Sequence, residues 1–198
     1  MNITDDQLET LRSQLATCKL GHGLGTVDEP CSVAAINLAL SGELSDRDPS
    51  ECMSPVIRRW VISVQDSMPV QMMAAGDEHG DRWRQALVGL AGTRDTKSEA
   101  ARVAMIIDWM WECLATDWQK WVPTSAHSAW NEMLHEKTAR AAYAAHAAAT
   151  AARAAYAAYA AARAYAARAA YAAHATARSW VKFDPASLLV RLTSTTAG

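Results

Sequence analysis

One run of the chain, Thr138 to Trp180, constrains the possible folds more than any other segment, because 26 of its 43 residues are alanine. Alanine has the highest helix propensity, and the run contains no glycine or proline that would interrupt a helix. It also contains all five tyrosines of the chain and no carboxylate. Since alanine side chains bury little area, the helix that this run predicts needs partners to cover it.

The predicted helix is too long for a compact molecule of this size. The pattern continues from about residue 125 to 182, which gives a length of about 87 Å at 1.5 Å per residue, whereas a compact chain of this length has a diameter of about 42 Å. On a helical wheel most Arg, Tyr and His residues share one sector, and the opposite sector is almost entirely alanine, with Tyr165 as an exception. Such a helix either projects from the molecule, or is interrupted without a Gly or Pro signal, or packs along copies of itself. We favour the third alternative, with the alanine face as the seam between helices, which predicts a homo-oligomer.

The residues before this run predict a series of amphipathic helices. Capping residues and prolines begin several helices, as at Thr4 to Gln7, at Ser54 to Pro55 and at Asp184 to Pro185, and Ser41 and Gly42 end another. The strongest apolar periodicity lies in residues 103–121, and no segment shows the strict alternation of a strand. We therefore predict an all-α fold. It divides into a compact head at 1–123, the long basic and aromatic helix at 124–182, and a short C-terminal helix with a tail at 183–198.

Charge is distributed unevenly along the chain. Residues 1–137 carry 12 Lys and Arg against 20 Asp and Glu, a net charge of −8, whereas residues 138–198 carry 7 against 1, a net charge of +6. A basic helix attracts either phosphate-bearing ligands or acidic protein surfaces. Binding of nucleic acid is not expected, because the acidic head would repel a polyanion.

The face of the long helix that carries Arg, Tyr and His is the main candidate binding site. Guanidinium groups bind phosphate and aromatic rings stack on bases, so arginines would hold phosphate, tyrosines would stack or donate, and histidines would add hydrogen bonds. The alternative is that these side chains keep an alanine helix soluble and fill grooves between helices. The candidate ligand-binding residues are Arg140, Tyr143, His146, Arg153, Tyr156, Tyr159, Arg163, Arg168, Tyr171 and His174, with Arg58 and Arg59 in the head.

A thiol enzyme is a weaker hypothesis. The loop from His22 to Cys31 combines glycines, a thiol and an imidazole, but Asp28 and Glu29 place negative charge where a thiolate would lie. The cysteines and His22 match no zinc-ligand spacing. We therefore expect no catalysis, no metal and no cofactor.

The sequence also indicates where the protein resides. No stretch approaches 18 consecutive strongly apolar residues, and the N-terminus lacks the basic and apolar regions of a secretory signal. Four cysteines in a chain of this size fit reduced thiols inside a cell. We therefore expect a cytoplasmic protein that does not span a membrane.

Several segments resemble a known family. They are Gly23 to Asp46 (GLGTVDEPCSVAAINLALSGELSD), Cys52 to Arg58 (CMSPVIR), Val64 to Pro69 (VQDSMP) and Phe183 to Arg191 (FDPASLLVR). The chain resembles an uncharacterised family of bacterial and bacteriophage proteins that carry an alanine-rich tail before such a Phe-Asp-Pro stretch. The resemblance carries no active-site residues. A phage origin would imply a small counter-defence protein of the host cytoplasm that sequesters a nucleotide signal as an oligomer.

Together these observations predict a non-catalytic, oligomeric protein that binds an anionic, nucleotide-derived small molecule. The alternative is a structural or protein-interaction module whose basic helix binds the acidic head of another subunit or an acidic surface of another protein.

Overall fold

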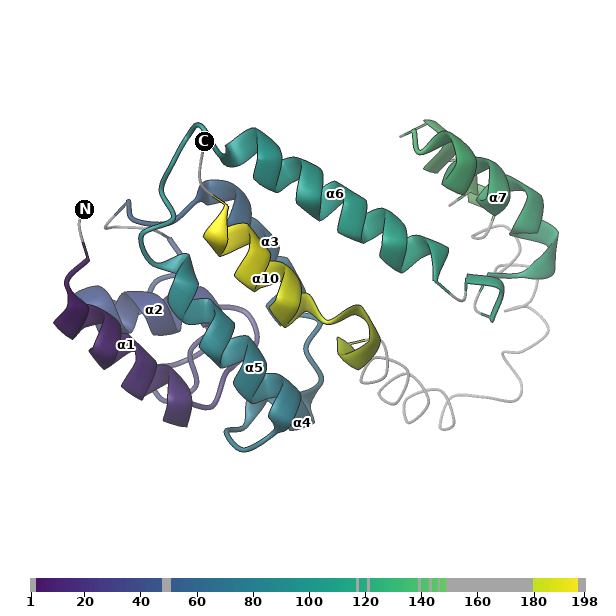
Figure 1. Cartoon of the computed structure of the whole chain (residues 1–198). Coiled ribbons are helices and arrows are strands. Elements are labelled where there is room, and N and C mark those ends of the chain that lie inside the picture. Colours follow the sequence, from purple (N-terminus) through teal and green to yellow (C-terminus); the bar gives the residue numbers. More distant parts are fainter. Residues whose placement is uncertain are drawn as a thin grey trace. The chain divides into compact units, whose positions relative to one another are not determined.

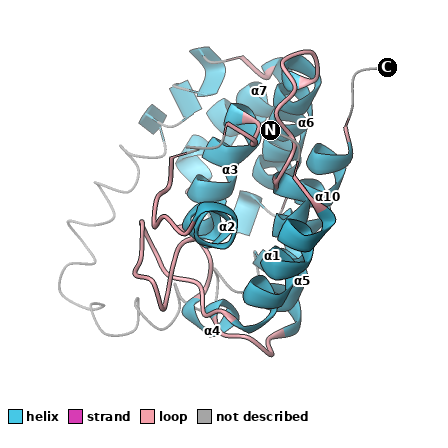
Figure 2. Ribbon diagram, turned by 90° about the vertical axis from the view of Figure 1, so that its left-hand side faces the viewer, coloured by secondary structure: helices cyan, strands magenta, loops and turns pink. Residues whose placement is uncertain are grey.

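The computed structural model describes residues 3–47, 51–116, 118–120, 122–138, 140–142, 144–145, 147–148 and 180–195 (Figure 1). Within these ranges every regular element is a helix, and the only β-type pairing is an isolated bridge between Gly25 and Pro30. Figure 2 shows helices joined by loops and no strand in the described part. The all-α prediction is confirmed. The chain divides into two units, 1–106 with 173–198 and 107–172, which are described separately.

The first unit is built from short helices whose ends follow local sequence chemistry. A capping box of Thr4 and Gln7 begins α1, Ser54 caps α3 with Pro55 in its first turn, and Gly42 ends α2 in the left-handed conformation. The elements are α1 (Asp5–Thr17), α2 (Ser32–Ser41), α3 (Pro55–Gln65), α4 (Val70–Met73), α5 (Glu78–Leu87), the 3-10 turn η1 (Val88–Leu90), the first half of α6 (Glu99–Ala115) and α10 (Pro185–Ser194).

Trp83 of α5 lies at the centre of this unit. Its side chain is fully buried, and its indole nitrogen donates to Ser32 Oγ and Gln65 Oε1, both at 3.0 Å. Its ring packs on Trp60 and Trp180, with ring centroids 5.9 and 5.5 Å away. Helix α5 therefore forms the middle of the unit, with α1 on one side and α10 on the other (Figure 1).

The C-terminal helix α10, which begins at the predicted Asp184–Pro185 position, belongs to this first unit. The Asp184 side chain caps it by accepting from the Ser187 amide, and Asp184 also accepts from Arg82 of α5 at 2.8 Å. Trp180, at the end of the alanine-rich run, is 7 % exposed against Trp83. The chain therefore returns to the core of the first unit after the alanine-rich run.

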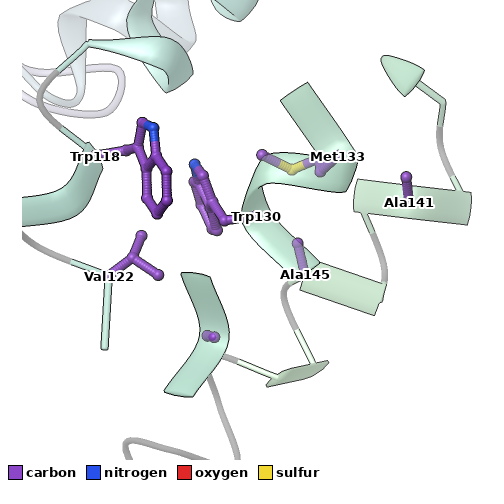
Figure 3. Close-up of a cluster of buried hydrophobic side chains, with 7 residues drawn as sticks. Trp118, Val122, Trp130, Met133, Ala141 and Ala145 are labelled. Carbon is purple, nitrogen blue, oxygen red and sulfur yellow. The ribbon is translucent and has the colours of Figure 1, made fainter. Parts of the chain in front are cut away.

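The second unit contains the end of α6, two 3-10 turns and α7 (His127–Glu136). In the small core of this unit Trp118 stacks on Trp130, with ring centroids 6.4 Å apart. The same core includes Met133, Ala141 and Ala145 (Figure 3). The described residues of 140–148 are helical. The alanine-rich run thus begins by packing its small side chains on α7 of the same chain.

The prediction of one unbroken helix from about residue 125 to 182 is wrong at its start. Helix α7 ends at Glu136, and Lys137 takes the left-handed conformation (φ 51°) while its amide donates to the Met133 carbonyl. No glycine or proline marks this break. The burial of Ala141 and Ala145 against α7 requires a turn here, so packing overrides helix propensity. Residues 149–179 lie outside the described part.

The predicted apolar helix over 103–121 also differs from the structure. Helix α6 ends at Ala115, Trp118 lies in a 3-10 turn, and Trp121 lies outside the described residues. The only buried residue of α6 is Arg102. Three side chains at helical spacing remain largely exposed: Val103 at 40 %, Ile107 at 46 % and Met110 at 50 %. The apolar periodicity correctly predicted a helix, but the side of α6 that carries these three residues is largely exposed in the described part.

Candidate binding groove

The structure describes three of the predicted ligand-binding residues. Arg140 is exposed in the second unit, Arg59 is exposed on α3, and Arg58 is half-buried with its Nη1 donating to the Asp46 carbonyl at 2.6 Å. These arginines belong to two different units, so neither unit assembles them into one site. The predicted residues Tyr143, His146, Arg153, Tyr156, Tyr159, Arg163, Arg168, Tyr171 and His174 lie outside the described part.

The first alanines of the run do not pack through the alanine sector, which is the face that the sequence predicts to pack. Ala141 and Ala145 are buried and Ala148 is partly buried, whereas Arg140 is exposed. At 100° per residue Ala141 and Ala145 lie about 100° and 140° from Arg140, which is inside the predicted Arg/Tyr/His sector, and Ala148 lies at its border, at about 80°. The described start of the run therefore gives no support to the alanine sector as the packing face.

The loop before α2 uses its cysteine as a helix cap. The Ala34 amide donates to Cys31 Sγ at 3.4 Å, and burial raises the pKa of the Cys31 thiol. His22 is exposed. A raised pKa disfavours the thiolate that a nucleophile needs, so the environment of Cys31 suits a cap better than a catalytic thiol. The described residues contain no group of three His, Cys, Asp or Glu side chains arranged to hold a metal ion.

A groove between α1 and α5 has the size of a ligand site. Its volume is about 640 Å³, within the range of about 300–1,000 Å³ that small-molecule sites occupy. It is lined by Arg12, Leu15, Ala16, Asp81, Arg84, Gln85, Val88 and Gly89. Aliphatic side chains form much of this lining, and the polar side chains supply mainly hydrogen-bond donors. This is the composition of a site that receives an apolar group together with an acceptor or an anion.

Arg84 is the buried polar group of this groove. It is 1 % exposed, donates to the carbonyls of Met73 and Ala74 at 3.0 and 2.7 Å, and forms an ion pair with Asp81. The hydrogen bond from Arg84 lowers the pKa of Asp81. Helix α4 approaches closely here, because a Cβ at Gly80 would clash with a backbone carbonyl of α4. The guanidinium is therefore fixed in place.

One donor of Arg84 remains unused. Its Nε has no hydrogen-bond partner among the described residues, although the atom is buried. A buried N–H without an acceptor costs about 1–3 kcal/mol, and most such groups in native proteins have a partner. Arg84 also lines the groove, but its Nε is closed to a water-sized atom, so an acceptor in the groove reaches this donor only after a shift of the groove wall.

Arg12 and Gln85 supply the exposed polar groups of the groove. The Arg12 guanidinium lies 3.3 Å from the Glu9 carboxylate, but the two side chains are 56 % and 76 % exposed. Exposed ion pairs contribute little, about 0–1 kcal/mol, so an anionic ligand can compete with Glu9 for Arg12. Gln85 is exposed on the outer face of α5 and offers an amide that donates and accepts.

Sequence reasoning missed this groove because its residues come from helices far apart in the chain. The only local indication is the spacing of Arg12, Arg84 and Gln85 on the polar sides of two predicted helices, and that pattern is equally typical of ordinary surfaces. Comparisons with protein-family models, curated proteins and solved structures give no significant match to this chain. In the described part, no helix has the length and apolar character needed to cross a bilayer.

Proposed function

We propose that this chain is a non-catalytic binding protein for a small organic anion of the nucleotide class, held in the groove between α1 and α5. The observation that supports this function best is a groove of about 640 Å³ at which the Arg12 guanidinium is held only by an exposed ion pair with Glu9. The aliphatic floor would receive a ring, and Arg12 would pair with the acidic group.

The absence of catalysis is part of the proposal, and two observations support it. Cys31 is a helix cap with a raised pKa, and the carboxylate nearest the groove, Asp81, is engaged by Arg84 and has a lowered pKa. A general acid or base works best with a pKa near neutral pH. The groove thus offers binding groups rather than a proton-transfer pair.

Arg140 and the predicted arginines and tyrosines of the alanine-rich run remain part of the proposal as a second source of anion binding. Homo-oligomerisation is likewise proposed from the sequence, because an alanine-rich helix needs partners to cover it. A role in sequestering a nucleotide signal rests on the family resemblance.

A thermal-shift and calorimetry experiment tests the groove. The full chain is titrated with AMP, ADP-ribose and cyclic dinucleotides, and a ligand at 100 times its dissociation constant should stabilise it by about 2.7 kcal/mol. Arg12→Ala should weaken binding, whereas Arg94→Ala, which removes an exposed arginine from the loop before α6, should leave binding unchanged. An absence of any shift with these anions, or equal losses from the two variants, would refute the groove as the site.

The exposed apolar side chains of α6 favour a second candidate, a protein-interaction module. Ile107 and Met110 are about half exposed, and exposed apolar clusters are typical of interaction surfaces. Light scattering separates the two functions. Association without ligand-induced stabilisation supports the interaction module, whereas ligand-induced stabilisation that is independent of association supports ligand binding.

A further inference from the structure

A second groove lies on the other side of α5, between α5 and α10. Its volume is about 470 Å³. It is lined by Arg82, Gln85, Ala86, Ala186, Ser187, Val190 and Arg191. Because α5 lies between α1 and α10 (Figure 1), this groove and the first one run along opposite sides of the same helix. They belong to the same unit and share Gln85.

The exposed side chain of Gln85 separates the two grooves and contributes to both linings. One turn further along, α10 closes the space beside Gly89, since a Cβ there would lie 2.8 Å from Thr193 Oγ1. A ligand that occupies both grooves therefore crosses α5 at Gln85.

The charges of the two grooves are alike, although the head as a whole is acidic. Among the described residues that line them, four are arginines and one is a carboxylate, Asp81, which is already paired with Arg84. In the second groove Arg82 Nη2 donates hydrogen bonds to the Asp184 carboxylate at 2.8 Å and to the Ser187 hydroxyl at 3.1 Å. Arg191 is exposed, and no described residue accepts a hydrogen bond from its guanidinium. The second groove therefore also has a cation without a carboxylate partner.

We infer that the ligand carries two acidic groups and lies across α5 at Gln85, with one acidic group beside Arg12 in the first groove and one beside Arg191 in the second. This inference rests on the proposed function of the first groove and adds the class of ligand, a linear molecule with two phosphates. Arg82 stays with Asp184 and orients α10, while the Gln85 amide contacts the part of the ligand that crosses α5.

The test compares mononucleotides with linear oligonucleotides on the full chain. Calorimetry with AMP, pApA and pApApA varies the number and spacing of phosphates while the base stays the same. The linear ligands should bind about tenfold more tightly than AMP, because a second charge-assisted contact is added. Arg191→Ala should remove this gain and leave the affinity for AMP unchanged, and Arg12→Ala should weaken all three ligands.

The outcomes distinguish this inference from the proposed function. If AMP binds and depends on Arg12, but pApA and pApApA bind no more tightly, the inference is refuted while the first groove stands. If Arg191→Ala and Arg94→Ala reduce the affinity for the linear ligands equally, the gain is a general charge effect, and the inference is again refuted. If no ligand binds, the proposed function itself fails.

Discussion

Substitution of Arg102 tests how the C-terminal helix is held to the head. Arg102 is 2 % exposed, and its guanidinium donates to the carbonyls of Thr93, Leu192 and Thr195 at 2.9, 3.3 and 3.0 Å. It also forms an ion pair with Glu99 at 3.0 Å. One side chain therefore joins the start of α6, the preceding loop and the last turn of α10.

Arg102→Met keeps much of the aliphatic volume and removes all of these donors. The Glu99 side chain, which is 19 % exposed, then keeps only one side-chain partner among the described residues, the Ser54 hydroxyl at 2.9 Å. The three backbone carbonyls lose the hydrogen bonds that Arg102 donates to them. Breaking a buried ion pair by removing one partner costs about 3–5 kcal/mol. This is a large fraction of the 5–15 kcal/mol that stabilises a typical domain. We expect a loss of about 3–5 kcal/mol in the free energy of unfolding.

Urea unfolding followed by tryptophan fluorescence measures this loss, because Trp83 and Trp180 lie in the same unit. The matched control is Arg94→Met, which removes an exposed arginine from the adjacent loop and should change the free energy by less than about 0.5 kcal/mol. A loss below about 1 kcal/mol for Arg102→Met, with an unchanged slope of free energy against urea, would refute the role assigned to Arg102.

Three further changes test other parts of the structure. Trp180→Ala should cost about 3–5 kcal/mol because its ring is buried against Trp83; an unchanged urea midpoint would mean that the end of the alanine-rich run is not anchored there. Ile107→Glu should change the free energy of unfolding by less than about 0.5 kcal/mol because the side chain is 46 % exposed, and a larger loss would show that this side of α6 is covered. Asp81→Asn tests the ion pair with Arg84, whose hydrogen bond lowers the pKa of Asp81 in the folded state. The stability from this pair is present above the unfolded-state pKa of about 3.9 and is lost as pH falls through the lower folded-state pKa. The free energies of unfolding of wild type and variant, measured at a series of pH values, should therefore converge in acid. A difference that stays constant with pH would refute the assignment.

The helix ends could be predicted because their causes are local. The capping box at Thr4, the cap and proline at Ser54 and Pro55, and the glycine after α2 act within a few residues of the helix that they begin or end. None of these features depends on which other helix lies nearby. The structure places them where the sequence predicts them.

The break at Lys137 could not be predicted in the same way. Lysine is a good helix former, and a non-glycine residue in the left-handed conformation is uncommon. The turn exists because Ala141 and Ala145 pack on Trp130 and Met133, and a sequence pattern does not record such a long-range contact. Helix propensity correctly predicted helix on both sides of the break but not the break itself.

Helix α6 shows a related limit of periodicity. The spacing of Val103, Ile107 and Met110 predicts an amphipathic helix, and a helix is present, but the spacing does not say whether anything covers the apolar side. The residue of this helix that is most buried is charged. Arg102 is buried because carbonyl groups from the preceding loop and from α10 converge on it, and those groups come together only in the folded chain.

The net charge of the head does not by itself decide whether the proposed groove binds an anion. A net charge of −8 over residues 1–137 argues against anion binding only if the charges are mixed evenly over the surface. Folding distributes the charges unevenly. Arg84 and Asp81 form an ion pair in the groove wall, and Arg102 is buried in an ion pair with Glu99. Arg12 is left at the groove with only a weak surface pair to Glu9. Because screening confines such charges to about 10 Å, the local balance decides what the groove can bind.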